Sequence, residues 1–504
     1  HLELRAPLRP TVNLYRVTAP VPALLALTCM LLFATATQAE PWVGPGEMAL
    51  RHDLQQLADA GVLHAPTMSW PLPWSDIKQD IGAVDSSQLS PRLQSALGRV
   101  QQRAAAETVT GDIDLLVEIA GTTDPWALRS FEDSPREEGE LTVAADWVGR
   151  RFAWKLSAGL AASPDDGQEF RPDGSYVAMS LGNWSISAGY LDRWWGPGWE
   201  GSLILSNNAR PLPSIGIDRN QAKPFTWPVL RWLGPWRFST FMGQFEDDRD
   251  YPEALLFGMR FESRPLPSLQ IAASRSAQWC GEGRPCDLST FGDLLTGNDN
   301  DQALADQPGN QLAGFDVRWS WPGGRVPLAL YGQAIGEDEA GFMPSKYLGL
   351  FGAEGWGEWG SLSWRAHAEY ADTACDFPTS PPEFGCAYTS GIYTSGYRYR
   401  GRVLGHTIDA DGESMGVGLL LVEASGNQWN LLARNVKLNR AGIALEHSLA
   451  DGPATVVDVT LSHGRTVAWG KIDVLLGYAD VSGDSAVIME NGARASLTWR
   501  YDLR

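Results

Sequence analysis

Apolar and polar side chains alternate with a period of two from about residue 111 to the end of the chain, and this pattern constrains the fold more than any other feature. It begins in residues 113–119, where apolar side chains alternate with Asp114 and Glu118. It recurs in later segments, for example residues 152–160, 361–370 and 496–503. Because successive side chains of a strand point to opposite faces, each segment predicts a strand with one apolar and one polar or charged face.

Two architectures can use such strands. A soluble β-sandwich would bury the apolar faces against each other, and for this many strands it stays an alternative. A closed barrel in lipid accounts for more, because strands of about ten residues with a charged second face are its sequence pattern, and closure leaves no unpaired edge. The 22 Trp and 53 Gly of the 504 residues fit this class. We therefore predict an all-β transmembrane barrel of antiparallel strands, with twenty alternating segments counted.

Loop lengths give an independent indication, because outer-membrane barrels have short periplasmic turns and long external loops. Short turns are expected at 149–150, 182–183, 234–235, 264–266, 322–324, 355–357 and 425–427. Longer connections are expected at 122–139, 163–174, 247–253, 277–310, 336–345 and 371–412. If a strand at 184–192 rises and a strand ending at Leu233 descends, residues 193–226 form one external excursion. An excursion of that length must fold over the mouth or into the lumen.

The segment before the strands has helical periodicity. Residues 47–60 form an amphipathic helix followed by Gly61, and Ser90 with Pro91 opens another that runs to about Glu107. Between them, Ser75 and Asp76 are expected to cap a short helix. We therefore predict that residues 40–108 form a small helical unit that packs onto the rest of the protein. Residues 109–504 are predicted to form the barrel.

The first 39 residues differ from everything after them. Three Arg precede an apolar run at 17–33, and small residues follow up to Ala39. This is the layout of a secretory signal peptide, so residues 1–39 are expected to be removed. A transmembrane anchor is the alternative, but Pro20 and Pro22 interrupt the run.

Charge and cysteine content agree with an exported protein. The net charge of -20 argues against nucleic acid as a partner. After residue 39 the cysteines form two close pairs, Cys280 with Cys286 and Cys375 with Cys386. In an exported chain these predict two local disulfides, which would stabilise the two longest external loops.

The stretch from Arg193 to Pro211 is the least ordinary part of the chain, with three Trp, two Arg and two Asn around a Gly-Pro-Gly corner. A Trp face stacks on the apolar face of a sugar ring, while Asn and Arg donate to hydroxyls and carboxylates. The stretch therefore predicts a sugar site. The alternative is a rigid plug, which the long excursion favours. The candidate residues are Arg193, Trp194, Trp195, Trp199, Asn207, Asn208 and Arg210.

This stretch, at 193–199 and 203–211, closely resembles the signature of the Wzi family of outer-membrane capsule-assembly proteins. The resemblance extends over the mature chain and more weakly includes residues 70–76. It implies a barrel of about eighteen strands with a helical bundle, here residues 40–108, at the periplasmic end. It also implies a surface lectin that attaches or organises capsular polysaccharide or exopolysaccharide. The terminal Leu503-Arg504 departs from the aromatic end of many outer-membrane barrels.

A second candidate glycan site follows Cys386. Tyr-Thr-Ser-Gly occurs twice, at 388–391 and 393–396, and Tyr and Arg then alternate. Arginine could pair with uronate or pyruvate carboxylates, while an exposed hairpin with stacked aromatics is the equally weighted alternative. The candidates are Tyr393, Tyr397, Arg398, Tyr399 and Arg400.

Other chemistry finds little support in the sequence. Residues 412–416 match a nucleophile-elbow pattern but lack its strand-turn-helix context, and the histidines have no metal spacing. We expect no enzyme, metal or cofactor. The expected partners are an acidic capsular polysaccharide or exopolysaccharide and outer-membrane lipid, with the protein a monomer. The alternative function is a channel or porin for solutes.

Overall fold

A computed structural model describes residues 42–503 except 83, 297–308, 324–325, 341–342, 380 and 445. The expected signal peptide, residues 1–39, lies outside the described residues. None of the helices in the described ranges combines the length and hydropathy that a membrane crossing requires.

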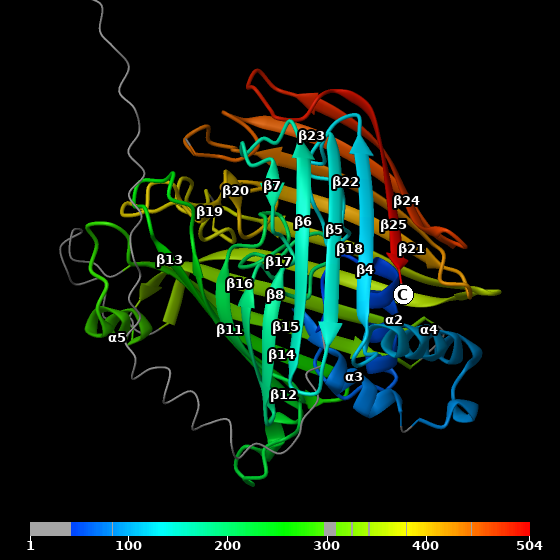
Figure 1. The fold of residues 1–504 in the computed structure, drawn as a ribbon. Coiled ribbons are helices and arrows are strands. Elements are labelled where there is room, and N and C mark those ends of the chain that lie inside the picture. The colour runs from blue at the N-terminus through cyan, green and yellow to red at the C-terminus, as the bar shows by residue number, and fades with distance from the viewer. Residues whose placement is uncertain are drawn as a thin grey trace, which may run out of the picture.

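The described strands close into one antiparallel barrel of eighteen strands (Figure 1). Two segments, β7 and β8, pair with successive parts of β6 and so occupy one position in the wall. The wall segments are β4 (Ile113–Thr122), β5 (Gly139–Val148), β6 (Phe152–Ala162), β7 (Phe170–Arg171), β8 (Tyr176–Leu181), β9 (Trp184–Gly189), β11 (Ser214–Arg219), β12 (Trp236–Gln244), β13 (Leu255–Leu266), β14 (Leu269–Trp279), β15 (Gly309–Trp321), β16 (Leu328–Ala340), β17 (Met343–Trp359), β18 (Leu362–Asp372), β21 (Glu413–Val422), β22 (Gln428–Leu438), β23 (Ala454–Val467), β24 (Gly470–Ser482) and β25 (Gly492–Leu503).

The predicted alternation places apolar side chains on one face of this wall and polar or charged side chains on the other. On β15, Val317 and Trp319 are 43% and 50% exposed, whereas Arg318 between them is 1% exposed and lies in the lumen. The ring closes where β25 pairs with β4. Apolar side chains therefore face outward toward lipid, and polar or charged side chains face inward.

Eighteen strands agree with the resemblance, and the count of twenty alternating segments was too high. Alternation does not distinguish a wall strand from an interrupted one such as β7 with β8. Nor does it exclude short pairs away from the wall: β1 (Trp42–Val43) with β3 (Leu72–Pro73), β2 (Ser69–Trp70) with β10 (Trp194–Trp195), and β19 (Arg398–Tyr399) with β20 (Arg402–Val403).

Four expected connections were wrong in detail. The turn expected at 264–266 lies at 267–268, because the pairing of β13 with β14 continues to Leu266 and Leu269. The turn expected at 355–357 lies instead at 360–361, because its glycines belong to β17 and leave room for neighbouring rings, as Gly357 does for Trp364. The long connection expected at 336–345 is the far part of the β16–β17 hairpin, whose pairing continues to Ala340 and Met343. The descending strand is β11 at 214–219, so the external excursion is 190–213, and 220–235 is a loop at the opposite end.

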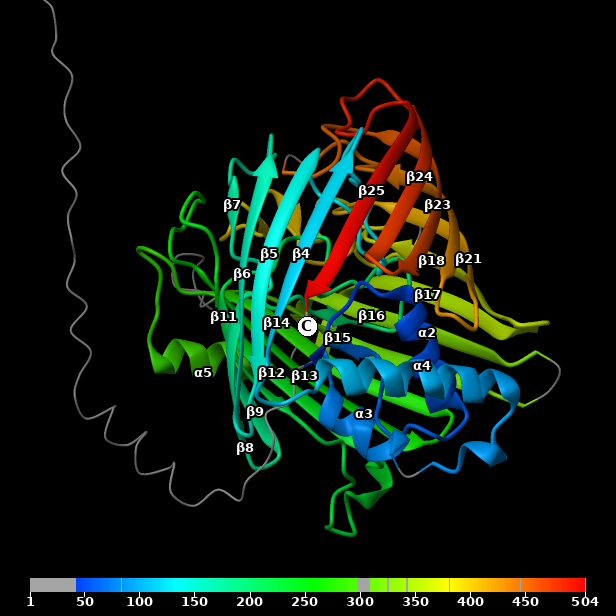
Figure 2. The same ribbon diagram turned by 45° about the vertical axis from the view of Figure 1, so that its right-hand side comes forward.

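Three helices occupy the N-terminal part of the described chain (Figure 2). They are α2 (Met48–Asp59), α3 (Trp74–Ile81) and α4 (Pro91–Glu107); a fourth, α5 (Leu288–Thr296), lies in an external loop, and η1 (Ser86–Gln88) and η2 (Arg231–Leu233) are 3₁₀ turns. Helix α3 begins one residue before Ser75, and no side chain caps it. Ser75 and Asp76 instead bond to residues 220 and 222.

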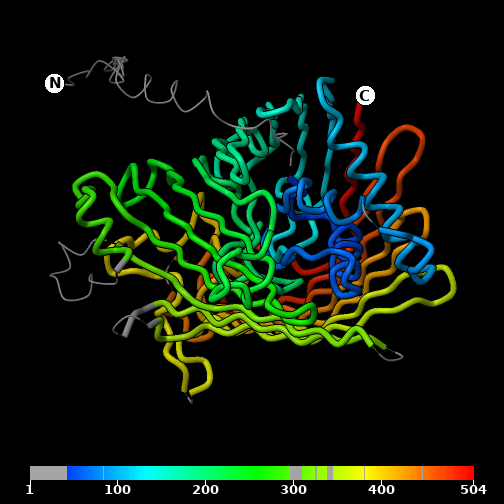
Figure 3. Tube along the Cα trace, turned by 90° about the horizontal axis from the view of Figure 1, so that it is seen from below, coloured from blue at the N-terminus to red at the C-terminus, as the bar shows by residue number. Residues whose placement is uncertain are grey.

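Helix α2 lies inside one end of the barrel, within the ring of strands (Figure 3). Its polar side chains are buried and bond to the wall: Asp59 receives two hydrogen bonds from Arg318, at 2.7 and 2.8 Å. His52 bonds to Ser363 and accepts from Arg365. Because these side chains bond to the wall from inside the ring of strands, α2 closes the barrel end to which it is bound.

Candidate functional site

The Arg193 to Pro211 stretch runs through the lumen as part of the excursion between β9 and β11. Its first residues form β10, which pairs Trp194 with Trp70 and Trp195 with Ser69 of the N-terminal segment. All three Trp of the stretch, Trp194, Trp195 and Trp199, are about 1% exposed. The stretch therefore links the helical end of the protein to the loops of the other end.

A carboxylate from the wall holds the turn that follows the Gly-Pro-Gly corner. Glu369 accepts the backbone N–H groups of Trp199 at 2.7 Å and of Glu200 and Gly201 at 3.1 Å. The Trp199 indole N–H donates to Glu354 at 2.8 Å. A Cβ atom on Gly201 would collide with the ring of His406, so only glycine permits this close approach. The turn is thus fixed by its backbone.

The Arg and Asn side chains of the stretch also have protein partners. Arg193 donates to Ser214 and lies over the ring of Phe241. Asn207 donates to the Phe131 carbonyl and Asn208 to that of Val403. Arg210 forms ion pairs with Asp166 and Asp173. These contacts engage most polar groups that made the stretch a sugar-site candidate, although the Trp194 indole N–H and the Asn207 side-chain oxygen are buried without a hydrogen-bond partner. A role in glycan binding stays a prediction.

The tyrosines of the second candidate site pack against the first. The hydroxyls of Tyr388 and Tyr397 donate to the carbonyls of Leu203 and Ile204, at 2.8 and 3.0 Å. Tyr393 donates to the carbonyl of Cys280 at 2.8 Å. Although these two contacts join residues 185 and 193 positions apart in the sequence, the two candidate stretches therefore form one buried assembly. We call it the lumen plug: residues 190–213 with 386–408.

The arginines of the second candidate site differ in exposure. Arg398 makes a two-point ion pair with buried Asp409, at 3.0 and 2.6 Å. Burial would raise the pKa of Asp409, but Arg398 and His447 lower it to about 2. Arg400 is only half-buried and lies over the ring of buried Tyr399. Arg400 is therefore the member of this candidate set that solvent reaches.

Both predicted disulfides are confirmed, Cys280–Cys286 and Cys375–Cys386. The second lies in the long connection between β18 and β21, which contributes residues 386–408 to the lumen plug. The first adjoins it through the Tyr393 contact. The disulfides thus belong to the structure that closes the lumen.

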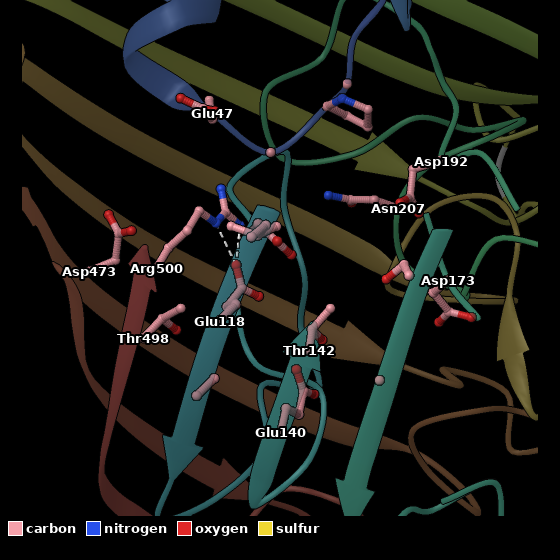
Figure 4. A pocket seen from close by; sticks show the side chains of 18 of the residues that line it. Glu47, Glu118, Glu140, Thr142, Asp173, Asp192, Asn207, Asp473, Thr498 and Arg500 are labelled. Atoms are coloured by element: carbon pink, nitrogen blue, oxygen red, sulfur yellow. Dashed lines mark hydrogen bonds and ion pairs between the residues drawn. The ribbon is translucent and has the colours of Figure 1, made fainter. Parts of the chain in front are cut away.

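A polar cavity of about 490 Å³ runs along the inner faces of the first and last strands, β4–β6 with β24 and β25 (Figure 4). Twelve Asp or Glu residues and six Lys or Arg residues line it. In Figure 4, Arg500 pairs with Glu118, and Thr142, Glu140 and Asp192 lie around the same space. Such a lining offers many acceptors to hydroxyl or cationic groups.

The pKa values of two loop carboxylates on this cavity are shifted in opposite directions. Burial would raise the pKa of Glu47, but Arg103, Lys471 and Arg500 lower it to about 2. Burial raises the pKa of Asp192 to about 6, and Asp173 adds to this although Arg136 opposes it. The cavity therefore contains one firmly ionised group and one that changes charge in mildly acidic solution.

Sequence reasoning did not find this cavity. Of the twelve candidate glycan residues, Asn207 alone lines it. The inward charges of β4 and β5 were visible as alternation, but their meeting with β25 depends on closure of the ring. Among the described residues, no three His, Cys, Asp or Glu side chains are grouped to hold a metal ion.

Comparison with known proteins adds an independent result. The family model for capsule assembly protein Wzi matches residues 116–486. A Klebsiella pneumoniae protein described as an uncharacterized 55.8 kDa protein in the cps region is 35% identical over 362 residues, 70% of this chain and 69% of its own. A solved structure is described as Wzi, an outer membrane protein involved in group 1 capsule assembly in Escherichia coli and a carbohydrate binding β-barrel. It aligns with a TM-score of 0.79 and 28% identity, covering 91% of this chain and 98% of that one.

Proposed function

Because the chain belongs to the Wzi family of capsule assembly proteins, we propose that it binds capsular polysaccharide or exopolysaccharide and attaches or organises it at the cell surface, without catalysis. The protein is an outer-membrane β-barrel. Residues 1–39 would be its signal peptide, 40–108 its periplasmic helical unit and 109–504 the barrel.

The lumen plug is the observation that carries this proposal. Residues 190–213 are bonded to the N-terminal segment through β10 and to residues 386–408 through the tyrosine hydroxyls. A barrel filled and cross-linked in this way is a rigid support for its external loops. A porin needs a continuous open path instead, so the filled lumen favours surface attachment over solute passage.

Within the candidate residues, we propose a division of roles. Arg193, Trp194, Trp195 and Trp199 are buried among protein partners, and support the loops from inside. Half-buried Arg400, which lies over the ring of buried Tyr399, provides contact with the glycan, because its guanidinium can pair with a sugar carboxylate. The polysaccharide would accordingly be acidic. We further propose that the protein is a monomer in lipid and binds no nucleic acid.

The proposal is tested by measuring how much polysaccharide stays attached to the cells of a deletion strain and how much is released. Complementation with the natural chain should restore attachment, and Arg400→Ala should lower it while the barrel still folds. Arg465→Ala is the matched control, because this exposed arginine lies near the opposite end of β23 and should not matter. Normal attachment in the deletion strain, together with no binding of purified protein to the organism's own polysaccharide, would refute the function.

A further inference from the structure

The loop of residues 220–235, which joins β11 to β12, exposes large apolar side chains. Trp227, Val229 and Trp232 are 59%, 60% and 64% exposed. The loop lies at the end of the barrel that holds the helices, and projects beyond the ends of β8 and β9 in the lower part of Figures 1 and 2. Three exposed side chains of this size in one short loop mark an interaction surface.

Hydrogen bonds hold the base of this loop in place, so the exposure of its apolar side chains is a defined feature of the fold. The Ser75 hydroxyl donates to the Asn220 carbonyl at 3.0 Å, and the Ala222 N–H donates to Asp76 at 3.1 Å. Arg219 donates to the carbonyls of Lys223 and Trp236, at 3.1 and 2.6 Å. Helix α3 and the wall thus hold the loop in place while residues 226–232 point away from the protein core.

An aromatic stack connects the loop to the lipid-facing wall. Phe225 stacks on Trp236 at a centroid distance of 4.4 Å, and Trp236 stacks on Phe261 at 5.7 Å. Trp236 and Phe261 lie on the outer faces of β12 and β13, because Arg237 and Arg260, their neighbours in sequence, are buried in the lumen. The apolar surface of the loop is therefore continuous with the surface that faces lipid.

The loop also reverses the charge of the protein. Residues 220–235 contain two basic side chains, Lys223 and Arg231, and no Asp or Glu, in a chain of net charge -20. Lys223 and Arg231 are exposed beside the exposed Trp residues. Aromatic and basic side chains together are typical of segments that lie in the interfacial region of an anionic membrane.

We propose that residues 224–233 insert Trp227, Val229 and Trp232 into the periplasmic leaflet of the outer membrane, with Lys223 and Arg231 on the phosphates of anionic phospholipid. Continuity with the lipid-facing wall favours lipid over a periplasmic protein as the occupant. The proposal rests on the membrane location of the barrel and not on polysaccharide binding, so either can fail without the other.

An environment-sensitive label at position 229 tests the insertion. Val229→Cys is labelled and placed in nanodiscs of phosphatidylcholine with or without phosphatidylglycerol; the four other cysteines after residue 39 are in disulfides. We expect emission shifted to shorter wavelength and quenching by lipid-borne quenchers, more strongly with phosphatidylglycerol. Ser425→Cys is the control, because it lies in an exposed turn at the same end and should stay open to aqueous quenchers. Lys223→Glu with Arg231→Glu should remove the phosphatidylglycerol effect.

Two results would overturn the proposal. One is a label at 229 that is as open to aqueous quenchers as the label at 425 in both lipids. The other is protection that appears only when periplasmic extract is added, which would assign the loop to a protein partner. Unchanged heat-modifiable migration on gels verifies that each variant is folded.

Discussion

At the scale of single residues, Asp192 makes the stability of the lumen sensitive to pH. Burial raises its pKa from 3.8 to about 6, so the folded protein binds this proton more tightly than the unfolded chain does. The stabilising contribution is therefore complete at low pH and is lost as the pH rises through about 6. Asp192→Asn should stabilise the protein at pH 8 by about 1–2 kcal/mol, since contact with the cavity weakens the full effect.

The heat-induced unfolding midpoint, measured between pH 4 and pH 8, checks this prediction. The advantage of Asp192→Asn should shrink toward pH 4. Asp248→Asn, at an exposed loop position, should follow the natural chain at every pH. Parallel profiles for Asp192→Asn and the natural chain would contradict the assignment.

At the scale of elements, one ion pair fastens the loop of residues 373–412. Arg398→Ala would leave the carboxylate of Asp409 buried without its main counter-charge, which should lower stability by about 3–5 kcal/mol. Because the isolated carboxyl would take up a proton more readily, the deficit should diminish in acid. Arg398→Lys should recover part of the loss, since it restores the charge but not the two-point geometry. An unfolding midpoint for Arg398→Ala equal to that of the natural chain would contradict this role.

The elements themselves were largely predictable, and the exceptions have physical causes. Alternation identified the wall because lipid outside and polar contents inside impose a strict period of two. It misplaced the turn near Gly357, since a glycine that makes room for Trp364 has the same sequence signal as a glycine that turns the chain. The candidate stretches were found by composition. Their mutual contact, such as Tyr388 on Leu203, was not, because it depends on tertiary packing across the lumen.

At the scale of the whole molecule, the lumen plug and α2 predict a poor conductor. Both are fastened to the wall, the first by Glu369 and the second by Arg318. Purified protein in planar bilayers should pass far less current than an open porin of similar strand number. The control is a variant lacking residues 196–209, which removes the central part of the plug and should conduct if it closes as a barrel. Steady, large conductance from the natural chain would favour the channel alternative.

The closure of the ring by β4 and β25 has a consequence for the order of assembly. These strands pair only after every strand between them has been made, and by then β10 lies between two segments, β9 and β11, that both belong to the wall. Residues 190–213 of the lumen plug, tied to the wall at both ends, would have to pass through the mouth of a finished barrel as a loop. We therefore expect the residues of the lumen plug to gather while β4 and β25 are still apart, so that pairing of these two strands closes a barrel that is already filled.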